Sequence, residues 1–138
     1  MNALIERLKR HESLALKVYR DRDKWAIGYG HQCPQDHPQI TIEQANEYLL
    51  ADIYHASDCL TRFPFTTNLS ITRREVCVEL MFWIGCTGFK NFTRMNKALN
   101  CGDWKLAALE LYNSELGKDP TLRGRARELA ELMWEGEA

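Results

Sequence analysis

The chain has 138 residues, of which 45% are hydrophobic and 27% are charged. It is long enough for one compact domain with a real core and too short for two ordinary domains. Its formal net charge of -1 gives no overall attraction to nucleic acid or to anionic lipid, so neither is expected as a partner.

The cysteines and the apolar stretches lead to two further expectations, one about the redox state of the thiols and one about membrane insertion. Five cysteines, at positions 33, 59, 77, 86 and 101, are odd in number and contain no Cys-x-x-Cys pair. This usage is typical of a reduced intracellular protein with small buried thiols. The N-terminal stretch MNALIERLKRHE has no uninterrupted apolar run, and no later stretch approaches the length of a transmembrane helix. We therefore expect no stable membrane insertion.

The first third of the chain predicts a helix followed by a hairpin. Leu4, Ile5 and Leu8 recur at helical spacing, which predicts a helix over 2–12. From Leu14 the apolar period drops to two, which predicts a short strand leading into a turn over 20–24 and a second strand over 25–29.

The rest of the chain predicts helices. The residues TIEQ at 41–44 form a capping box, and an apolar stripe follows until Pro64. Further helices are predicted over 73–84, 90–97, 103–112 and 120–134, with stops at Gly85, Gly88, Gly102, Gly117 and Gly136. The expected organisation is one α+β domain: a helix and β-lobe over about 1–40, a long connecting helix over about 41–63, and a helical lobe over about 64–138.

Two carboxyl groups at the first boundary suggest acid–base chemistry. Glu12 continues the apolar face of the first helix near its C-terminal end. Desolvation and the negative end of the helix dipole both disfavour an ionised carboxyl there, so we expect a raised pKa, as a general acid needs. Asp21, on the hairpin, is the candidate for a second carboxylate that a solvated turn keeps ionised.

An ordinary structural role explains the same carboxylates. Glu12 would then pair with an arginine such as Arg123 or Arg125, and Asp21 and Asp23 would be common turn residues. Spacing alone leaves both interpretations open.

The stretch ESLALKVYRDRDKWAIGYGH resembles the active-site signature of the phage-type, T4-like lysozymes of glycoside hydrolase family 24. That signature has a Glu, an Asp on the hairpin and then TIGxGH. The stretch RREVCVELMFWIGCTGFKNFTRMNKALNCGDW resembles the helical lobe of that family, and LRGRARELAELMWEG resembles its arginine-bearing last helix. The resemblance covers nearly the whole chain and implies a lysozyme-like fold.

The resemblance implies a role for several residues. Glu12 would be the general acid, and Asp21 would activate or orient water and stabilise the oxocarbenium-like state. The enzymes that it resembles invert, which requires about 6.5 to 9.5 Å between the two carboxyl groups. His31 and Asp52 would form a buried ion pair that ties the hairpin to the connecting helix.

Ala26 departs from the family pattern at its third catalytic position. The family has a threonine there, whose hydroxyl helps to hold the attacking water. Three outcomes follow: Asp23 or Tyr29 positions the water, the sugar's own hydroxyl attacks as in a lytic transglycosylase, or the domain binds glycan or another protein. Losing one such hydrogen bond costs about 1 to 3 kcal/mol, or roughly ten- to hundredfold in rate, so hydrolysis remains the main expectation.

Aromatic and basic residues supply candidates for substrate binding. Trp83 stands where relatives carry an amide, and Trp83, Phe82 and Tyr29 could stack on sugar rings. Core packing is the competing explanation for Trp83 and Phe82, and for Phe82 it is at least as good. The resemblance implies that at least one arginine of the last helix, which we expect to be Arg125, faces the cleft and supports Glu12 or contacts peptide stems, and a solvated helix face is the competing explanation. Three side chains are expected elsewhere, Arg127 on a solvated helix face and Trp104 and Trp134 in the core.

The resemblance therefore implies an endolysin, a muramidase that cleaves the β-1,4 bond between N-acetylmuramic acid and N-acetylglucosamine in bacterial peptidoglycan. It would be a monomer, made in the host cytoplasm and reaching the cell wall through a partner such as a holin. His31, Cys33 and His37 fit no standard zinc spacing, so no metal or other cofactor is expected.

Overall fold

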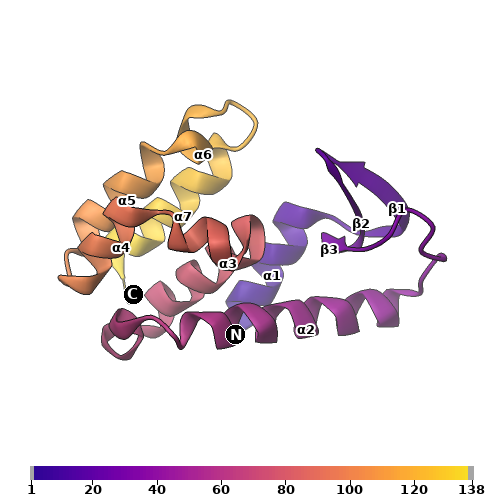
Figure 1. Cartoon of the computed structure of the whole chain (residues 1–138), viewed down its shortest axis with the longest axis horizontal. Helices are drawn as coiled ribbons and strands as arrows, with labels where there is room; N and C mark the ends of the chain where they lie inside the picture. The colour runs from indigo at the N-terminus through magenta and orange to yellow at the C-terminus, as the bar shows by residue number, and fades with distance from the viewer. Residues whose placement is uncertain (1, 137–138) are drawn as a thin grey trace. The chain divides into compact units, whose positions relative to one another are not determined.

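A computed structural model describes residues 2–136, which adopt the expected α+β lysozyme-like fold of helices with a small antiparallel sheet (Figure 1). The chain divides into two compact units, residues 1–55 and 56–138. The division falls inside a long helix, after His55. Among the described residues, no helix is both long enough and apolar enough to span a membrane.

The first unit begins with helix α1 (Asn2–Glu12), which matches the predicted helix. Leu4 and Leu8 are almost fully buried, as their helical spacing predicts. The helix ends because Ser13 takes a left-handed conformation, with φ of 60°, and its amide donates to the Lys9 carbonyl at 3.0 Å. This turn sends the chain directly into the sheet.

Three strands in the order β1-β2-β3 form the sheet, and their bounds are β1 (Ala15–Asp21), β2 (Lys24–Gly28) and β3 (His31–Gln32). The predicted turn over 20–24 is too wide, because β1 continues to Asp21 and pairs it with Lys24. Only Arg22 and Asp23 lie in the turn, and Arg22 takes a φ of 59°. The two-residue strand β3 is too short to leave an alternating pattern, and the sequence did not predict it.

Helix α2 (Ile42–Leu60) begins at the predicted capping box. The Thr41 amide donates to Gln44 Oε1 at 2.9 Å, and the Gln44 amide donates to Thr41 Oγ1 at 3.1 Å. One face of α2 is buried, as its apolar stripe predicts, through Ala45, Leu49, Ile53 and Ala56. Ile27, Ile40 and Ala45 form the centre of the core beneath the sheet.

The second unit contains the end of α2 and the remaining helices: the 3-10 helix η1 (Pro64–Asn68), α3 (Ile71–Lys90), α4 (Thr93–Asn100), α5 (Trp104–Tyr112), α6 (Glu115–Lys118) and α7 (Arg123–Glu135). Helices α5 and α7 pack side by side (Figure 1). The sequence predicted neither of the short helices, η1 and α6.

The glycine stops were right in part. Gly85 has a φ of 82° and kinks α3, but helical structure resumes and continues to Lys90, so Gly88 lies inside a helix. Gly117 likewise lies within α6. Gly136 does end α7, with a φ of 72°. A stop predicted from a glycine fails where tertiary packing continues the helix beyond it.

The expectation of five reduced cysteines is wrong for two of them. Cys59, near the end of α2, and Cys86, just beyond the kink in α3, form a disulfide. Of the other three, only Cys77 is fully buried, whereas Cys33 is half-buried and Cys101 is exposed. The two bonded cysteines are 27 residues apart, and nothing in their local sequence marks them as partners.

Candidate active site

Glu12 is the last residue of α1, and its side chain lies against the backbone of Gly30. A Cβ built on Gly30 would lie 3.0 Å from Glu12 Cδ and would overlap Oε1 of the same carboxyl group. Gly30 also has a φ of 73°, which side-chain-bearing residues rarely adopt. Because Gly30 has no side chain, the Glu12 carboxyl can lie very close to the backbone that follows β2.

Asp21 occupies the last position of β1, immediately before the hairpin turn, and it is exposed. Water can therefore stabilise its carboxylate. The turn itself is held by Arg20, whose Nε donates to the Arg22 carbonyl at 2.7 Å, while the Arg20 guanidinium lies 5.1 Å from the Trp25 ring centroid.

Ala26, the position at which the family pattern breaks, has two cross-strand partners, Tyr19 in β1 and Gln32 in β3. Directly opposite residues in an antiparallel pair point to the same face, and so do residues two apart along a strand. Tyr19, Asp21 and Ala26 therefore share one face of the sheet.

The charges of both candidate catalytic carboxylates also act on the Tyr19 phenol. Burial raises the pKa of its phenol, and the negative charges of Glu12, Asp21 and Cys33 raise that pKa further. Glu12, Asp21 and Tyr19 are thus electrostatic neighbours. Sequence reasoning missed Tyr19, although its place two residues before Asp21 on an alternating strand was the signal that could have found it.

Ala26 is only 1% exposed, so its methyl group is packed rather than presented to solvent. The two side chains proposed as substitutes for the missing hydroxyl are not equivalent. Asp23 is exposed in the turn. Tyr29 packs against the core centred on Ile27, with Lys9 Nζ 5.4 Å from its ring centroid.

His31 and Asp52 form the contact that the family resemblance implied, with Nδ1 and Oδ2 2.8 Å apart. It joins β3 to α2. The pair was expected to be buried, but it is only partly buried, since the side chains are 28% and 30% exposed. The His31 ring stacks on Tyr48 at 4.4 Å, which fixes the imidazole in place.

His37 and Cys33, which are near His31 in the sequence, are each surrounded by different groups. His37 Nδ1 lies 2.8 Å from the Pro38 carbonyl oxygen, and its Nε2 lies 3.3 Å from the Tyr48 hydroxyl. Burial raises the pKa of the Cys33 thiol. Over residues 2–136, no three histidine, cysteine or acidic side chains gather as a metal site would require.

In the second unit, Arg125 is held by Glu79 and Trp83. Arg125 Nε donates to Glu79 Oε2 at 3.0 Å, and the guanidinium lies 4.3 Å from the Trp83 ring centroid. Glu79 is fully buried and Arg125 is 11% exposed, so the ion pair lies in the interior of this unit. The sequence did not identify Glu79, since a lone glutamate in an apolar helix gives no sign of its partner.

The other candidates lie in α3 and α7. Phe82 and Trp83 are both half-buried. Arg123 Nε donates to the Gly117 carbonyl at 3.2 Å, which ties α7 to α6. Arg127 lies on an exposed helix face, as expected, and pairs with Glu131 at 3.1 Å.

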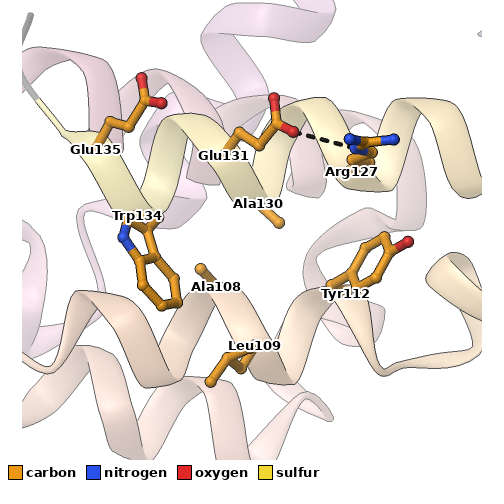
Figure 2. Close-up of a pocket in the computed structure, with 8 residues that line it drawn as sticks. All are labelled: Ala108, Leu109, Tyr112, Arg127, Ala130, Glu131, Trp134 and Glu135. Carbon is orange, nitrogen blue, oxygen red and sulfur yellow. Dashed lines mark hydrogen bonds and ion pairs between the residues drawn. The ribbon is translucent and has the colours of Figure 1, made fainter.

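A cavity of about 610 Å³ lies in the groove between α5 and α7 (Figure 2). Trp134 and Tyr112 line it, and Trp134 is 43% exposed, so the expectation that Trp134 belongs to the core is wrong. Trp104 is half-buried, and the Arg73 guanidinium lies 4.9 Å from its ring centroid. The α5–α7 cavity contains none of the predicted catalytic residues.

Comparison with known proteins identifies the family. A search among curated proteins gives no match to the chain. The family model described as phage lysozyme matches residues 9–128, a span that includes Glu12, Asp21 and Arg125. A match over this share of the chain supports a peptidoglycan-hydrolysing glycosidase of the endolysin type. The chain belongs to the phage lysozyme family.

Proposed function

We propose that the chain is a muramidase that cleaves the β-1,4 bond between N-acetylmuramic acid and N-acetylglucosamine, with Glu12 as general acid and Asp21 as the carboxylate that activates water. The observation that carries this proposal is the arrangement of Glu12, Tyr19 and Asp21. One carboxyl group is packed on the Gly30 backbone, the other is solvated at the end of β1, and the charges of both raise the pKa of the Tyr19 phenol.

The different surroundings of the two carboxyl groups suit two different roles. Glu12 gives its proton to the glycosidic oxygen as the bond to the anomeric carbon breaks. Asp21 stabilises the positive charge that develops on the sugar ring and accepts a proton from the attacking water. The expected course is inversion, in which water attacks the face of the sugar opposite the leaving group.

For substrate binding we propose Trp83, Phe82, Tyr29 and Arg125. The half-buried aromatic rings of Phe82 and Trp83 offer surfaces on which sugars stack. Arg125 is fixed on Glu79 and Trp83, so it would lose little conformational entropy on meeting an acetamido or carboxyl group of the wall polymer.

The buried methyl of Ala26 keeps one alternative open. Without a threonine hydroxyl to hold water, the hydroxyl of the muramoyl residue could attack its own anomeric carbon, with Glu12 still protonating the leaving oxygen. The products would then carry anhydromuramoyl ends rather than reducing ends. A third possibility is a domain that binds glycan without cleaving it.

Product analysis separates these activities. Purified peptidoglycan is incubated with the protein and with the Glu12→Gln and Asp21→Asn variants, and the products are identified by mass spectrometry. We expect new reducing muramoyl ends from the unaltered protein and a large loss of them in both variants. A matched control is Glu6→Gln, which removes an exposed carboxyl from the same helix and should retain full activity.

The other outcomes assign the alternatives. Anhydromuramoyl ends that depend on Glu12 would mean transglycosylation. Binding to peptidoglycan with no soluble products, and no effect of Glu12→Gln on binding, would mean a binding module.

We propose further, from family membership alone, that the protein acts as a monomer and passes from the host cytoplasm to the wall with the help of a holin-like partner. Expression in bacteria tests this route. Lysis should begin only when the inner membrane is permeabilised, and lysis without permeabilisation would contradict it.

A further inference from the structure

Because Ala26 has no hydroxyl, the attacking water has one hydrogen-bond acceptor fewer at this position. A water that attacks an anomeric carbon through one lone pair has two O–H groups to donate. Asp21 can accept one of them. The family resemblance implies a threonine at position 26 whose side-chain oxygen would accept the other, but the alanine side chain has no polar atom, and Ala26 is only 1% exposed.

The sheet places another hydroxyl beside this position. Tyr19 pairs directly with Ala26, so the two side chains leave neighbouring strands on the same face, which Asp21 shares. A phenol reaches farther from its strand than a threonine hydroxyl does.

The charge state of Tyr19 fits a hydrogen-bonding role. Burial raises its pKa, and the charges of Glu12 and Asp21 raise it further, so the phenol keeps its proton and does not compete with Asp21 as a base. Because both charges raise this pKa, the phenol lies within the electric field of both carboxylates.

The other two candidates are less well placed. Asp23 is exposed in the turn and stands beyond the end of β1. Tyr29 lies beyond the end of β2, where its ring packs against the Ile27 core and the Lys9 ammonium lies over it. Of these three side chains, only Tyr19 pairs directly with Ala26, whose partner on the other neighbouring strand is Gln32.

We infer that Tyr19 holds the attacking water in this chain, in place of the threonine hydroxyl that Ala26 lacks. The inference rests on the proposed muramidase function. The water donates one O–H to the Asp21 carboxylate and the other to the Tyr19 phenol oxygen. Its oxygen bonds to the anomeric carbon while the glycosidic bond breaks, Glu12 gives its proton to the leaving oxygen, and Asp21 takes the proton that the water loses.

Kinetics of three variants test this inference on the full chain: Tyr19→Phe, Ala26→Ser and the two combined. Release of reducing ends from solubilised peptidoglycan glycan gives kcat and KM, and thermal unfolding reports the fold. Tyr19→Phe removes only the hydroxyl and should lower kcat roughly ten- to hundredfold with little change in KM. Tyr54→Phe, which removes an exposed hydroxyl from α2, is the matched control and should match the unaltered protein.

Coupling between the two positions separates a water-holding role from a packing role. A serine at position 26 supplies a second acceptor, so Ala26→Ser should raise kcat more in the Tyr19→Phe background than in the unaltered protein. A kcat for Tyr19→Phe within threefold of the unaltered value overturns the inference. Equal effects of Ala26→Ser in both backgrounds also overturn it.

The failure of the proposed function looks different. If the unaltered protein releases no reducing ends, or if Glu12→Gln releases as many as the unaltered protein, the muramidase proposal fails. If the unaltered protein is active, depends on Glu12 and is indifferent to Tyr19→Phe, only the role of Tyr19 fails.

Discussion

Gly30 shows how a single residue can control the position of a candidate catalytic acid. Gly30→Ala would place a Cβ where the Glu12 carboxylate lies and would force a side chain onto a backbone with φ of 73°. We expect a loss of about 1–3 kcal/mol in the free energy of unfolding. Because Glu12 must move away, activity should also fall by roughly ten- to hundredfold.

Urea unfolding and muramidase assays measure the two effects of Gly30→Ala. The control is Gly124→Ala in α7, where no atom lies within 4 Å of a built Cβ. Alanine favours a helix over glycine by about 0.5–1 kcal/mol, so this control should be slightly more stable and fully active. Full activity in Gly30→Ala would contradict the importance of the close approach of Glu12.

Cys77 makes a pH-dependent prediction, because burial raises the pKa of its thiol from 9.0 to about 12. Above pH 9 the unfolded chain loses this proton while the folded chain keeps it. Stability therefore falls as the pH rises from 9 towards 12, by up to about 1.4 kcal/mol per pH unit. Below pH 9 the group contributes no pH dependence.

Urea unfolding between pH 8 and 11 tests the Cys77 prediction. The fall in unfolding free energy should be steeper for the unaltered protein than for Cys77→Ala. Cys101→Ala, which removes an exposed thiol, should follow the unaltered protein. Equal slopes for the unaltered protein and Cys77→Ala would show that the thiol titrates alike in the folded and unfolded chains.

At the scale of the elements, the ion pair between Glu79 and Arg125 joins α3 to α7. Glu79 is fully buried, and the two atoms are 3.0 Å apart. Glu79→Ala leaves the guanidinium buried without this carboxylate, so we expect a loss of about 3–5 kcal/mol in the free energy of unfolding. Equilibrium urea unfolding measures it.

The exposed pair of Arg127 and Glu131 on α7 provides the control for Glu79→Ala. Its side chains are 69% and 60% exposed, so Glu131→Ala should cost less than about 0.5 kcal/mol. If the two variants lose the same stability, burial is not what makes the Glu79 pair important.

Local patterns explain which elements were predictable. The capping box at Thr41 is a contact between residues three apart, and the structure contains both of its hydrogen bonds. The α1 and α2 stripes likewise follow from one helical period. By contrast, Arg73 donates to the Met133 carbonyl across 60 residues, and no local pattern records such a contact.

The candidate site was predictable only in part for the same reason, namely that local patterns do not record contacts between distant residues. Glu12 and Asp21 remain predictions that rest on the family resemblance, because their spacing alone left an ordinary structural role open. Tyr19 was missed because its importance arises from strand register, which pairs it with Ala26. The exposure of Trp134 depends on how α5 and α7 pack, and its own helix shows nothing of that.

At the scale of the whole molecule, the disulfide lies within one of the two units. Cys59 and Cys86 both belong to the unit 56–138 and close a loop of 27 residues. In the chain-entropy account a loop of this size contributes about 3.5 kcal/mol, by limiting the unfolded chain. The combined Cys59→Ser and Cys86→Ser variant should therefore lose about that much stability, while Cys101→Ser should lose almost none.

Thiol counting and hydrogen exchange together test where the disulfide acts. Unfolded but unreduced protein should show three free thiols, those of Cys33, Cys77 and Cys101, and reduction should raise the number to all five. Reduction should then speed amide exchange in 56–138 much more than in the unit that holds Glu12 and the hairpin. Five thiols before reduction would contradict the bond. Equal acceleration in both units would instead mean that they unfold as a single cooperative structure, so that the hairpin that carries Asp21 depends on a bond outside its own unit.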